Sequence, residues 1–363
     1  MAIRSIFSLT FRMSERKPKV LVVGSGGVGA IGALCLTLNG EADVTLVVRS
    51  DYAKVNESGF TIKSVTYGEH ENWKPRHIVK SVADAYERFG DFDFILLTTK
   101  NIPDGPITCE DIIRPAVTSK TVIILLQNGI GIEKPMIEQF PHNVILSGVT
   151  LLCSTNINCV VCNLLKDQIY LGAWSNPNIE NHAEKEQSAI DEFTRIYCNE
   201  KYNKVFIDEN VEKTRWEKLL YNAALNSTTT IVNLDVSRCQ IAGANDELFR
   251  PAMREVVAIA ASEGIEISPE TVEKFIHISD GQFYSPSMCV DARKKQLFES
   301  EIILGDPIKI AEANGVETPV LKTLYTLLSM VQFRIKEEKG IIKIDENEYR
   351  NTNSDSYPDI LKK

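Results

Sequence analysis

The hydrophobic positions in the first third of the chain fall into short, nearly unbroken runs separated by stretches with helical spacing. The runs are rich in Val, Ile and Leu, so each could be buried on both faces, as parallel strands are. They are residues 19–23 (KVLVV), 43–49 (DVTLVVR), 91–100 (DFDFILLTTK) and 120–129 (KTVIILLQNG). Because helical stretches lie between some of them, the pattern predicts a doubly wound, mostly parallel sheet.

The pattern then changes twice. Residues 143–154, 159–165 and 168–174 are further apolar runs without long helices between them, so the sheet is expected to continue in another manner. From residue 209 onward long helical patterns replace the strands. The sequence therefore predicts an N-terminal α/β domain with a Rossmann-type doubly wound sheet and an all-α C-terminal domain. The expected boundaries are a flexible extension over 1–17, the α/β domain over 18–208, the helical domain over 209–340 and a flexible tail over 341–363.

The net charge and the length of the apolar runs indicate which classes of partner the chain is not expected to bind. The chain has 363 residues, 49 acidic and 40 basic, and a formal net charge of −9, with no Lys/Arg block. Such a chain offers no basic field for a phosphate backbone, so nucleic acid is not an expected partner. The longest apolar runs, such as residues 122–126, are far shorter than the roughly 20 residues that cross a bilayer. A soluble protein without a membrane partner is expected.

Cysteine and histidine usage indicates neither a disulfide framework nor a metal site. The eight cysteines are scattered, which favours free thiols in a reducing compartment and hence the cytoplasm. The CVVC stretch at 159–162 has a CxxC spacing but no second CxxC or nearby histidine pair, and it has the pattern of a strand. The five histidines are dispersed along the chain.

The first twelve residues, MAIRSIFSLTFR, contain two arginines, two serines and no acidic residue. This composition weakly resembles a mitochondrial presequence. The alternatives are a disordered extension or a start codon upstream of Met13. The sequence leaves these alternatives open.

A glycine-rich turn follows the first predicted strand and opens the first predicted helix. Its residues are Gly24, Ser25, Gly26, Gly27, Val28 and Gly29, a GxGxxG pattern. In this context Gly24 permits a tight turn, Gly26 lets the backbone approach a pyrophosphate, and Gly29 lets helix and strand pack closely. The helix N-terminus attracts the phosphate charge. The turn predicts a dinucleotide site.

Arg49 indicates which dinucleotide is bound. It ends the second predicted strand, about 20 residues beyond the turn, where an acidic residue would accept hydrogen bonds from the ribose of NAD. A guanidinium cannot accept a hydrogen bond, but it can hold a 2′-phosphate and stack on adenine. The expected cofactor is NADP. Asp51, two residues further, keeps NAD as the alternative.

Three polar residues recur at a spacing of four in the stretch that opens the helical half. Lys218, Asn222 and Asn226 advance about 40° per step around a helix and so share one face. Asparagine has poor helix propensity, so this face implies a polar partner. The alternative is that the face is merely solvated.

Together these motifs resemble the ketopantoate reductase family (2-dehydropantoate 2-reductase). The resemblance covers roughly residues 19–335. Besides the glycine turn and Arg49, it rests on LLTTK (96–100), LLQNGIG (125–131), WEKLLYNAALN (216–226) and SPSMCVDARKKQLFESEIILG (285–305). It implies an NADP-dependent oxidoreductase acting on CH–OH. The order and spacing of several separate motifs make it more specific than the glycine turn alone.

The resemblance implies two catalytic residues. Lys218 would be the proton donor, and Glu299 would contact the substrate hydroxyl and Lys218. Hydride arriving at a ketone carbon leaves charge on oxygen, which an ammonium can stabilise and then neutralise. A lysine with an ordinary pKa of about 10.4 begins protonated, and partial desolvation would make it a readier acid.

The resemblance also implies binding roles. Asn222 and Asn226 would orient the substrate, and Ser287 would bind its carboxylate. Asn128 would lie beside both nicotinamide and substrate, and Lys100 would approach the cofactor phosphate. No metal is implied.

Two positions depart from the family pattern, Val236 and Leu304, where polar residues are frequent, and either change could alter the substrate. The expected activity is reduction of 2-dehydropantoate to (R)-pantoate with NADPH, in pantothenate and coenzyme A biosynthesis. The first alternative is a reductase of another ketone or 2-oxo acid. The second is a non-catalytic NADP-binding sensor, which would not need a proton donor. The oligomeric state is left open, with a homodimer as the candidate assembly.

Overall fold

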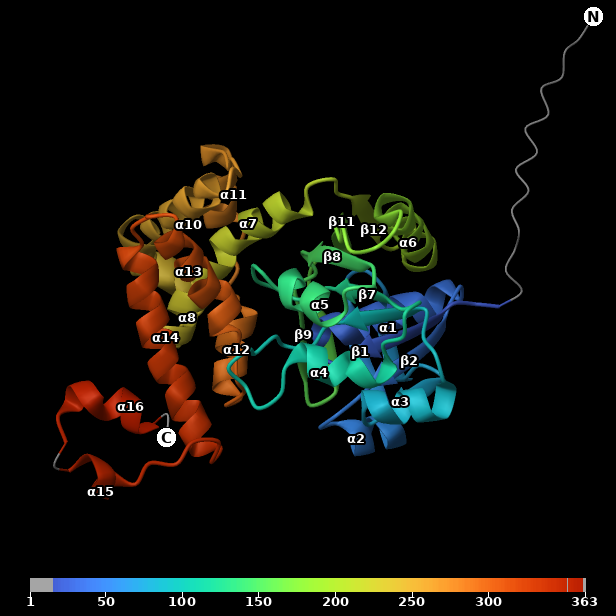
Figure 1. Ribbon diagram of the computed structural model, residues 1–363, viewed down its shortest axis with the longest axis horizontal. Coiled ribbons are helices and arrows are strands. Elements are labelled where there is room, and N and C mark those ends of the chain that lie inside the picture. Colours follow the sequence, from blue (N-terminus) through green and yellow to red (C-terminus); the bar gives the residue numbers. More distant parts are fainter. Residues whose placement is uncertain (1–15, 351, 362–363) are drawn as a thin grey trace, which may run out of the picture.

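The computed structural model describes residues 16–350 and 352–361, arranged as an α/β half and a helical half (Figure 1). The stretch whose composition weakly resembles a presequence, residues 1–12, lies outside the described residues. Arg16 and Lys17, at the end of the expected extension, are in contact with the α/β half: Arg16 pairs with Asp93 at 2.6 Å, and Lys17 Nζ donates to Gly40 O.

The α/β half contains an eight-stranded sheet in the order β12-β11-β8-β7-β6-β1-β2-β5. The strands from β8 to β5 are mutually parallel, β11 runs antiparallel to β8, and β12 is parallel to β11. The bounds are β1 Lys19–Val23, β2 Asp43–Val47, β5 His77–Val79, β6 Phe94–Leu97, β7 Val122–Leu125, β8 Ile145–Thr150, β11 Gln168–Trp174 and β12 Lys204–Ile207. The doubly wound sheet, and its continuation in another manner after β8, are confirmed.

Helices cover both faces of this sheet, as alternation along β1 shows. Val20 and Val22 belong to a core shared with α1 and α6, whereas Leu21 and Val23 belong to a core shared with α3, α4 and α5. The bounds are α1 Gly27–Asn39, α2 Tyr52–Ser58, α3 Val82–Phe89, α4 Cys109–Ile113 with the 3₁₀ turn η1 Arg114–Ala116, α5 Glu133–Gln139 and α6 His182–Tyr197. The core beneath α3 to α5 is continuous with the core of the helical half.

A second, four-stranded sheet in the order β4-β3-β10-β9 was not predicted as a separate unit. Its strands are β3 Phe60–Ser64, β4 Gly68–Trp73, β9 Ser154–Ile157 and β10 Val160–Asn163. The CVVC stretch lies at β10, as its strand pattern predicted, and the eight cysteines, which all lie within the described residues, are free thiols. Within the described residues no cluster of His, Cys, Asp or Glu has the arrangement of a metal site.

The helical half begins with α7 and ends with short helical turns beyond the long α14 (Figure 1). The bounds are α7 Val211–Tyr221, the π-helical turn η2 Asn222–Asn226, α8 Ser227–Val232, α9 Val236–Ile241, η3 Asn245–Phe249, α10 Arg250–Ser262, α11 Pro269–His277, α12 Ser287–Arg293, η4 Glu301–Gly305, α13 Asp306–Ala313, α14 Pro319–Glu338, α15 Glu346–Tyr349, η5 Ser354–Ser356 and α16 Tyr357–Leu361. The fold class expected from the sequence, an α/β domain followed by a helical domain, is confirmed.

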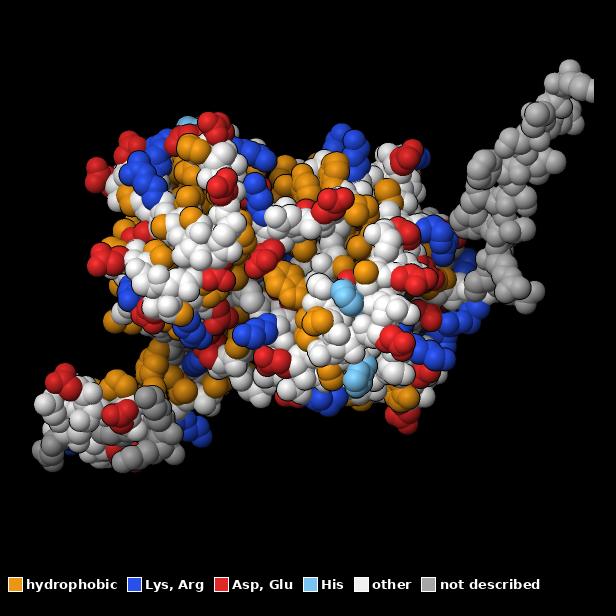
Figure 2. All heavy atoms as spheres, turned by 45° about the horizontal axis from the view of Figure 1, so that its top comes forward, with side chains coloured by type: hydrophobic (Ala, Val, Ile, Leu, Met, Phe, Trp, Pro, Cys, Tyr) orange, Lys and Arg blue, Asp and Glu red, His pale blue; other side chains and the backbone are white. Residues whose placement is uncertain are grey.

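Val236 and Leu304, the two departures from the family pattern, are both fully buried in the apolar core of the helical half. On the face shown in Figure 2, basic and acidic side chains are interspersed. In the described part of the chain, no helix is both long and apolar enough to span a membrane.

Candidate active site

The glycine turn lies between the end of β1 and the start of α1, and its glycines serve different purposes. Gly24 has φ +112°, which L side chains rarely adopt. A Cβ at Gly29 would lie 1.9 Å from Gly24 O, so helix and turn can pack only without it. A Cβ at Gly26 would meet nothing within 4 Å. The open side of Gly26, at the N-terminus of α1, is where a pyrophosphate could approach.

Gly27 is required for a protein contact. Its Cβ would lie 2.3 Å from Ser154 O, because β9 passes against the start of α1. Asn156 of β9 reinforces this contact by donating from Nδ2 to Ser25 O at 2.8 Å, and Lys294 Nζ donates to Asn156 O at 2.8 Å. The helical half therefore reaches the glycine turn through β9. No sequence motif marked Asn156 or Lys294.

Arg49 follows β2 and is exposed. It forms no hydrogen bond or ion pair with the residues that the structure describes. Asp51, at the N-cap of α2, is half-buried. The guanidinium is thus accessible at the end of the second strand, the position from which the sequence predicted contact with a 2′-phosphate.

The helix α7 lies at the junction of the two halves (Figure 1). Lys218 is on α7, and its ammonium is held by the α/β half. Nζ donates to Asn128 Oδ1 at 2.8 Å and to Thr150 O at 2.6 Å. An ammonium has three N–H donors, so one remains for a ligand. Burial, followed by the charge of Arg215, lowers the pKa of Lys218 to about 7. A lysine with such a pKa can give up a proton near neutral pH.

The two asparagines that follow Lys218 are buried, with exposed fractions of 5% for Asn222 and 4% for Asn226. The alternative of a solvated face is therefore wrong for these residues. Asn226 Nδ2 donates to Asn222 Oδ1 at 2.9 Å, across the π-helical turn that contains both. Asn222, Lys218 and Asn128 line a small polar cavity of about 10 Å³. Asn226 is not among the residues that line this cavity, but it holds the Asn222 side chain that does.

Lys100 and Glu299 lie together. Lys100 Nζ is 3.1 Å from Glu299 Oε2 and 2.9 Å from Asp291 Oδ2, and Asn101 N donates to Glu299 Oε1 at 3.3 Å. Burial alone would lower the pKa of Lys100, but the charges of Asp291 and Glu299 outweigh it and raise the pKa above its ordinary value. The Glu299 carboxylate bonds to Lys100 and Asn101. Among the described residues it forms no hydrogen bond with Lys218, although its charge acts to raise the pKa of that lysine.

Ser287 is the first residue of α12 and is half-buried. Asp291 lies four residues later on the same short helix, and it pairs with Lys100. Residues four apart share a helix face, so Ser287 and Asp291 belong to the same side of α12. Of the predicted residues, the structure brings Asn128, Asn222 and Asn226 together around Lys218. It brings Glu299 together with Lys100, and Ser287 is related to that pair only through its place on α12.

Sequence reasoning missed three residues of this region. Thr150 offers only its backbone carbonyl, which no sequence pattern can mark. Asp291 lies four positions after Ser287 in the SPSM segment, and that spacing could have pointed to it. Arg215 lies one helical turn before Lys218 on the predicted helix, and its charge on an otherwise core-facing side was the available signal.

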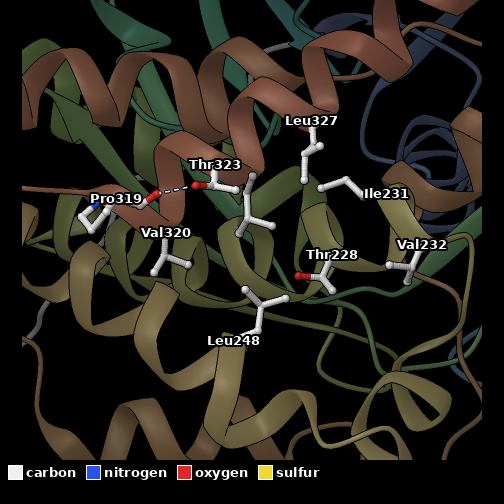
Figure 3. A pocket seen from close by; sticks show the side chains of 9 residues that line it. Thr228, Ile231, Val232, Leu248, Pro319, Val320, Thr323 and Leu327 are labelled. Atoms are coloured by element: carbon white, nitrogen blue, oxygen red, sulfur yellow. Dashed lines mark hydrogen bonds between the residues drawn. The ribbon is translucent and has the colours of Figure 1, made fainter.

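A groove with a volume of about 410 Å³ lies elsewhere, between α8 and α14 (Figure 3). Its lining is apolar apart from Thr228 and Thr323, and Thr323 Oγ1 is already bonded to Pro319 O. It contains no charged side chain and none of the predicted site residues. A carboxylate-bearing substrate would find no counter-charge there.

Comparison with known proteins points to one family for both halves. Residues 20–176 match the family model for ketopantoate reductase PanE/ApbA, and residues 210–332 match the model for its C-terminal domain. An uncharacterised protein of Saccharomyces cerevisiae is 46% identical over 351 residues, which cover 90% of this chain and 97% of the yeast protein.

Two solved structures have the same fold. The crystal structure of 2-dehydropantoate 2-reductase from Methylococcus capsulatus is 27% identical, with a TM-score of 0.70 over 87% of this chain and 97% of that one. A ternary structure of D-mandelate dehydrogenase with NADH and anilino(oxo)acetate is 21% identical, with a TM-score of 0.74 over 88% and 99% of the two chains.

Proposed function

The chain belongs to the ketopantoate reductase family, and we propose that it reduces 2-dehydropantoate to (R)-pantoate with NADPH, a step in pantothenate and coenzyme A biosynthesis. The observation that carries the proposal is the buried ammonium of Lys218, fixed by Asn128 and Thr150 with one N–H left for a ketone oxygen. A non-catalytic sensor would have no use for such a group.

The residues at the glycine turn fit a dinucleotide. Gly26 leaves open space at the N-terminus of α1, and Gly24, Ser25, Gly27, Val28 and Gly29 shape the turn around it. Arg49 is exposed at the strand end and would hold a 2′-phosphate, and Lys100 would approach the same cofactor. The bound cofactor would supply the hydride. NADP is the cofactor that Arg49 favours, and NAD is the alternative.

Lys218 would stabilise the negative charge that develops on the substrate oxygen and then donate its proton to that oxygen. Asn128 accepts a hydrogen bond from Lys218 and so fixes the direction of the remaining N–H. Asn222, held by Asn226, would orient the substrate from the same cavity.

The second group of residues would bind the rest of the substrate. Ser287 would donate to the carboxylate, and Glu299 would accept from the hydroxyl. Glu299 is 5% exposed and is held by Lys100, so its position is fixed before a substrate arrives. A prepositioned acceptor loses little entropy on binding.

A reductase of another 2-oxo acid is the second candidate. Val236 and Leu304 favour it because they are fully buried apolar side chains where polar residues are frequent in the family. D-mandelate dehydrogenase shows that a related fold can hold a different oxo acid. The proposal also includes an α/β domain over residues 18–208, a helical domain over residues 209–340 and a cytoplasmic location. It includes a homodimer as well, which sedimentation velocity would check.

The experiment is a panel of 2-oxo acids with NADPH and with NADH, followed by loss of the absorbance of the reduced cofactor. The proposal expects 2-dehydropantoate to have the highest kcat/KM, with NADPH preferred. A higher kcat/KM for another 2-oxo acid would select the second candidate. Cofactor binding without oxidation in the presence of any panel member would contradict both and favour the sensor.

A further inference from the structure

A buried ion pair lies directly behind Lys218. Arg215 and Glu133 are only 4% and 0% exposed, and Arg215 Nε lies 2.6 Å from Glu133 Oε1. Ser147 joins both: its Oγ accepts from Arg215 Nε at 2.7 Å and donates to Glu133 Oε1 at 2.7 Å. The three side chains come from α7, α5 and β8, so they tie the first helix of the helical half to the sheet.

The other nitrogens of the guanidinium donate to backbone carbonyls at the ends of β7 and β8. One nitrogen donates to Gln127 O at 2.9 Å and Gly129 O at 3.3 Å, the carbonyls on either side of Asn128. The other donates to Leu125 O and Gly148 O, each at 3.3 Å. The planar fork of an arginine can satisfy these acceptors together, which an ammonium cannot.

Arg215 and Lys218 are three residues apart on α7 and therefore adjacent on one face. Both contact the same two segments of the sheet. Lys218 bonds to the Asn128 side chain and to Thr150 O, while Arg215 bonds to the backbone around Asn128 and to Gly148 O. The helix is thus attached at two neighbouring points, only one of which touches the proposed substrate position.

We propose that Arg215, held by Glu133 and Ser147, is a positioning residue for the reduction: it fixes Lys218 relative to Asn128 and places a second positive charge one helical turn from the proton donor. This inference rests on the proposed function of the same site. The motifs that carry the resemblance to the family include none of these three residues in an assigned role.

A contribution to folding stability does not by itself explain the buried Arg215–Glu133 pair. Two buried charges lose hydration that their attraction barely repays, and apolar replacements of such pairs are often neutral or stabilising. The pair instead positions α7 against the backbone around Asn128 and places a positive charge beside Lys218. The charge of Arg215 is the largest influence after burial that lowers the pKa of Lys218, Lys100 acts in the same direction, and Glu299 opposes them. Glu133 offsets the charge of Arg215.

The test is the pH profile of kcat in three variants. Two of them should shift its basic limb in opposite directions, and the third should leave the limb where it is. Arg215→Met removes a positive charge, so Lys218 should hold its proton to higher pH and the basic limb should move up. Glu133→Gln leaves the positive charge of Arg215 unopposed, so the limb should move down. Arg215→Lys keeps the charge but loses the fork, so the limb should stay while kcat falls about tenfold to a hundredfold through misplacement. Basic limbs that coincide in Arg215→Met and Glu133→Gln, or move in the same direction, would overturn the proposal.

Arg250→Gln is the matched control, because it breaks an Arg–Glu pair with Glu273 on the surface of the helical half. It should leave kcat and its pH profile unchanged. Thermal unfolding of every variant separates misfolding from a local effect. If Arg215→Met does not fold, the comparison is between Glu133→Gln and Arg215→Lys, and equal basic limbs in these two would overturn the proposal.

A second readout does not depend on turnover. Competitive acetylation of Lys218 across a pH series, followed by mass spectrometry, reports the protonation of its amine directly. The midpoint should rise in Arg215→Met and fall in Glu133→Gln. If the wild type reduces no 2-oxo acid, the proposed function fails while these midpoints still support or overturn the effect of Arg215 on Lys218.

Discussion

Nζ of Lys218 lies 2.8 Å from Oδ1 of Asn128, which joins the first helix of the helical half to the loop after β7. The amide oxygen accepts this hydrogen bond, so the amide nitrogen of Asn128 is turned away from Lys218. The Asn128 side chain therefore fixes the ammonium of Lys218 through its oxygen and leaves its own amide N–H groups to face a ligand. The contact places the Lys218 ammonium at the carboxyl ends of the strands, where doubly wound sheets bind their ligands.

Replacing Lys218 with alanine should abolish most turnover and leave cofactor binding intact. The change removes the proposed acid but leaves the glycine turn and Arg49 in place. General acid assistance is typically worth about 10²- to 10⁴-fold, so kcat should fall by at least about a hundredfold. Steady-state kinetics and NADPH fluorescence titration measure the two properties.

Lys213→Ala is the control, since Lys213 is on the same helix and its side chain forms no hydrogen bond or ion pair with the residues that the structure describes. It should keep nearly full turnover. Nearly normal turnover in Lys218→Ala instead would mean that Lys218 is only a structural residue.

The pH dependence of reduction should follow the ionisation of Lys218. Its pKa is lowered to about 7, chiefly by burial and then by the charge of Arg215. A proton donor must begin protonated, so kcat should be greatest below this pKa and fall as pH rises through it. Profiles of kcat at saturating cofactor and substrate check this. A plateau reaching the ordinary lysine range of about 10 would contradict the role of burial.

Two adjacent glycines should respond differently to alanine. A Cβ at Gly26 meets nothing within 4 Å, so Gly26→Ala should unfold at the wild-type temperature yet bind NADPH more weakly, because its methyl group occupies the approach to the phosphate. A Cβ at Gly27 would lie 2.3 Å from Ser154 O, so Gly27→Ala should lower the unfolding temperature by displacing β9. Differential scanning fluorimetry with and without NADPH measures both. Equal unfolding temperatures for the two variants would refute this division.

The sequence predicted elements best where a local pattern dictates them. The runs around Val20 to Val23 and Ile123 to Leu125 are apolar at every position, and both became buried parallel strands. The second sheet was not foreseen because β3 and β10 are nearly a hundred residues apart, and each is too short and mixed to reveal its partner. Pairing between distant strands depends on tertiary packing, which local periodicity does not record.

The same distinction applies to the site. The GxGxxG pattern and the spacing of Lys218 and Asn222 were visible because motif and helix period are local. The pairing of Lys100 with Asp291 and Glu299 was not, since it joins segments almost two hundred residues apart. The π-helical turn at Asn222–Asn226 was also missed, because the sequence there has an ordinary helical pattern.

Cofactor preference should change in Arg49→Asp. The substitution replaces an exposed positive charge at the end of β2 with a negative one, so it should repel a 2′-phosphate. The KM for NADPH should rise far more than the KM for NADH. Arg76→Asp is a control for the change of net charge, since Arg76 is another exposed arginine of the α/β half. If Arg49→Asp keeps the wild-type preference, Arg49 does not contact the 2′-phosphate.

Comparing variants of Glu299 and Asp291 should distinguish a contact with the substrate from an effect on Lys100. Both carboxylates pair with Lys100, at 3.1 Å and 2.9 Å, but only Glu299 is proposed to accept from the substrate hydroxyl. Glu299→Gln keeps the shape and removes the charge from that hydrogen bond, and a hydrogen bond to a charged group contributes about 1.5 to 3 kcal/mol. The KM for the 2-oxo acid should therefore rise about tenfold or more, with a smaller loss of kcat. Asp291→Asn removes the same charge from Lys100 without that substrate contact, so its effect should appear mainly in the KM for the cofactor. If the two variants raise the KM for the 2-oxo acid equally, Glu299 acts only by holding Lys100, and the substrate hydroxyl must be bound by another group.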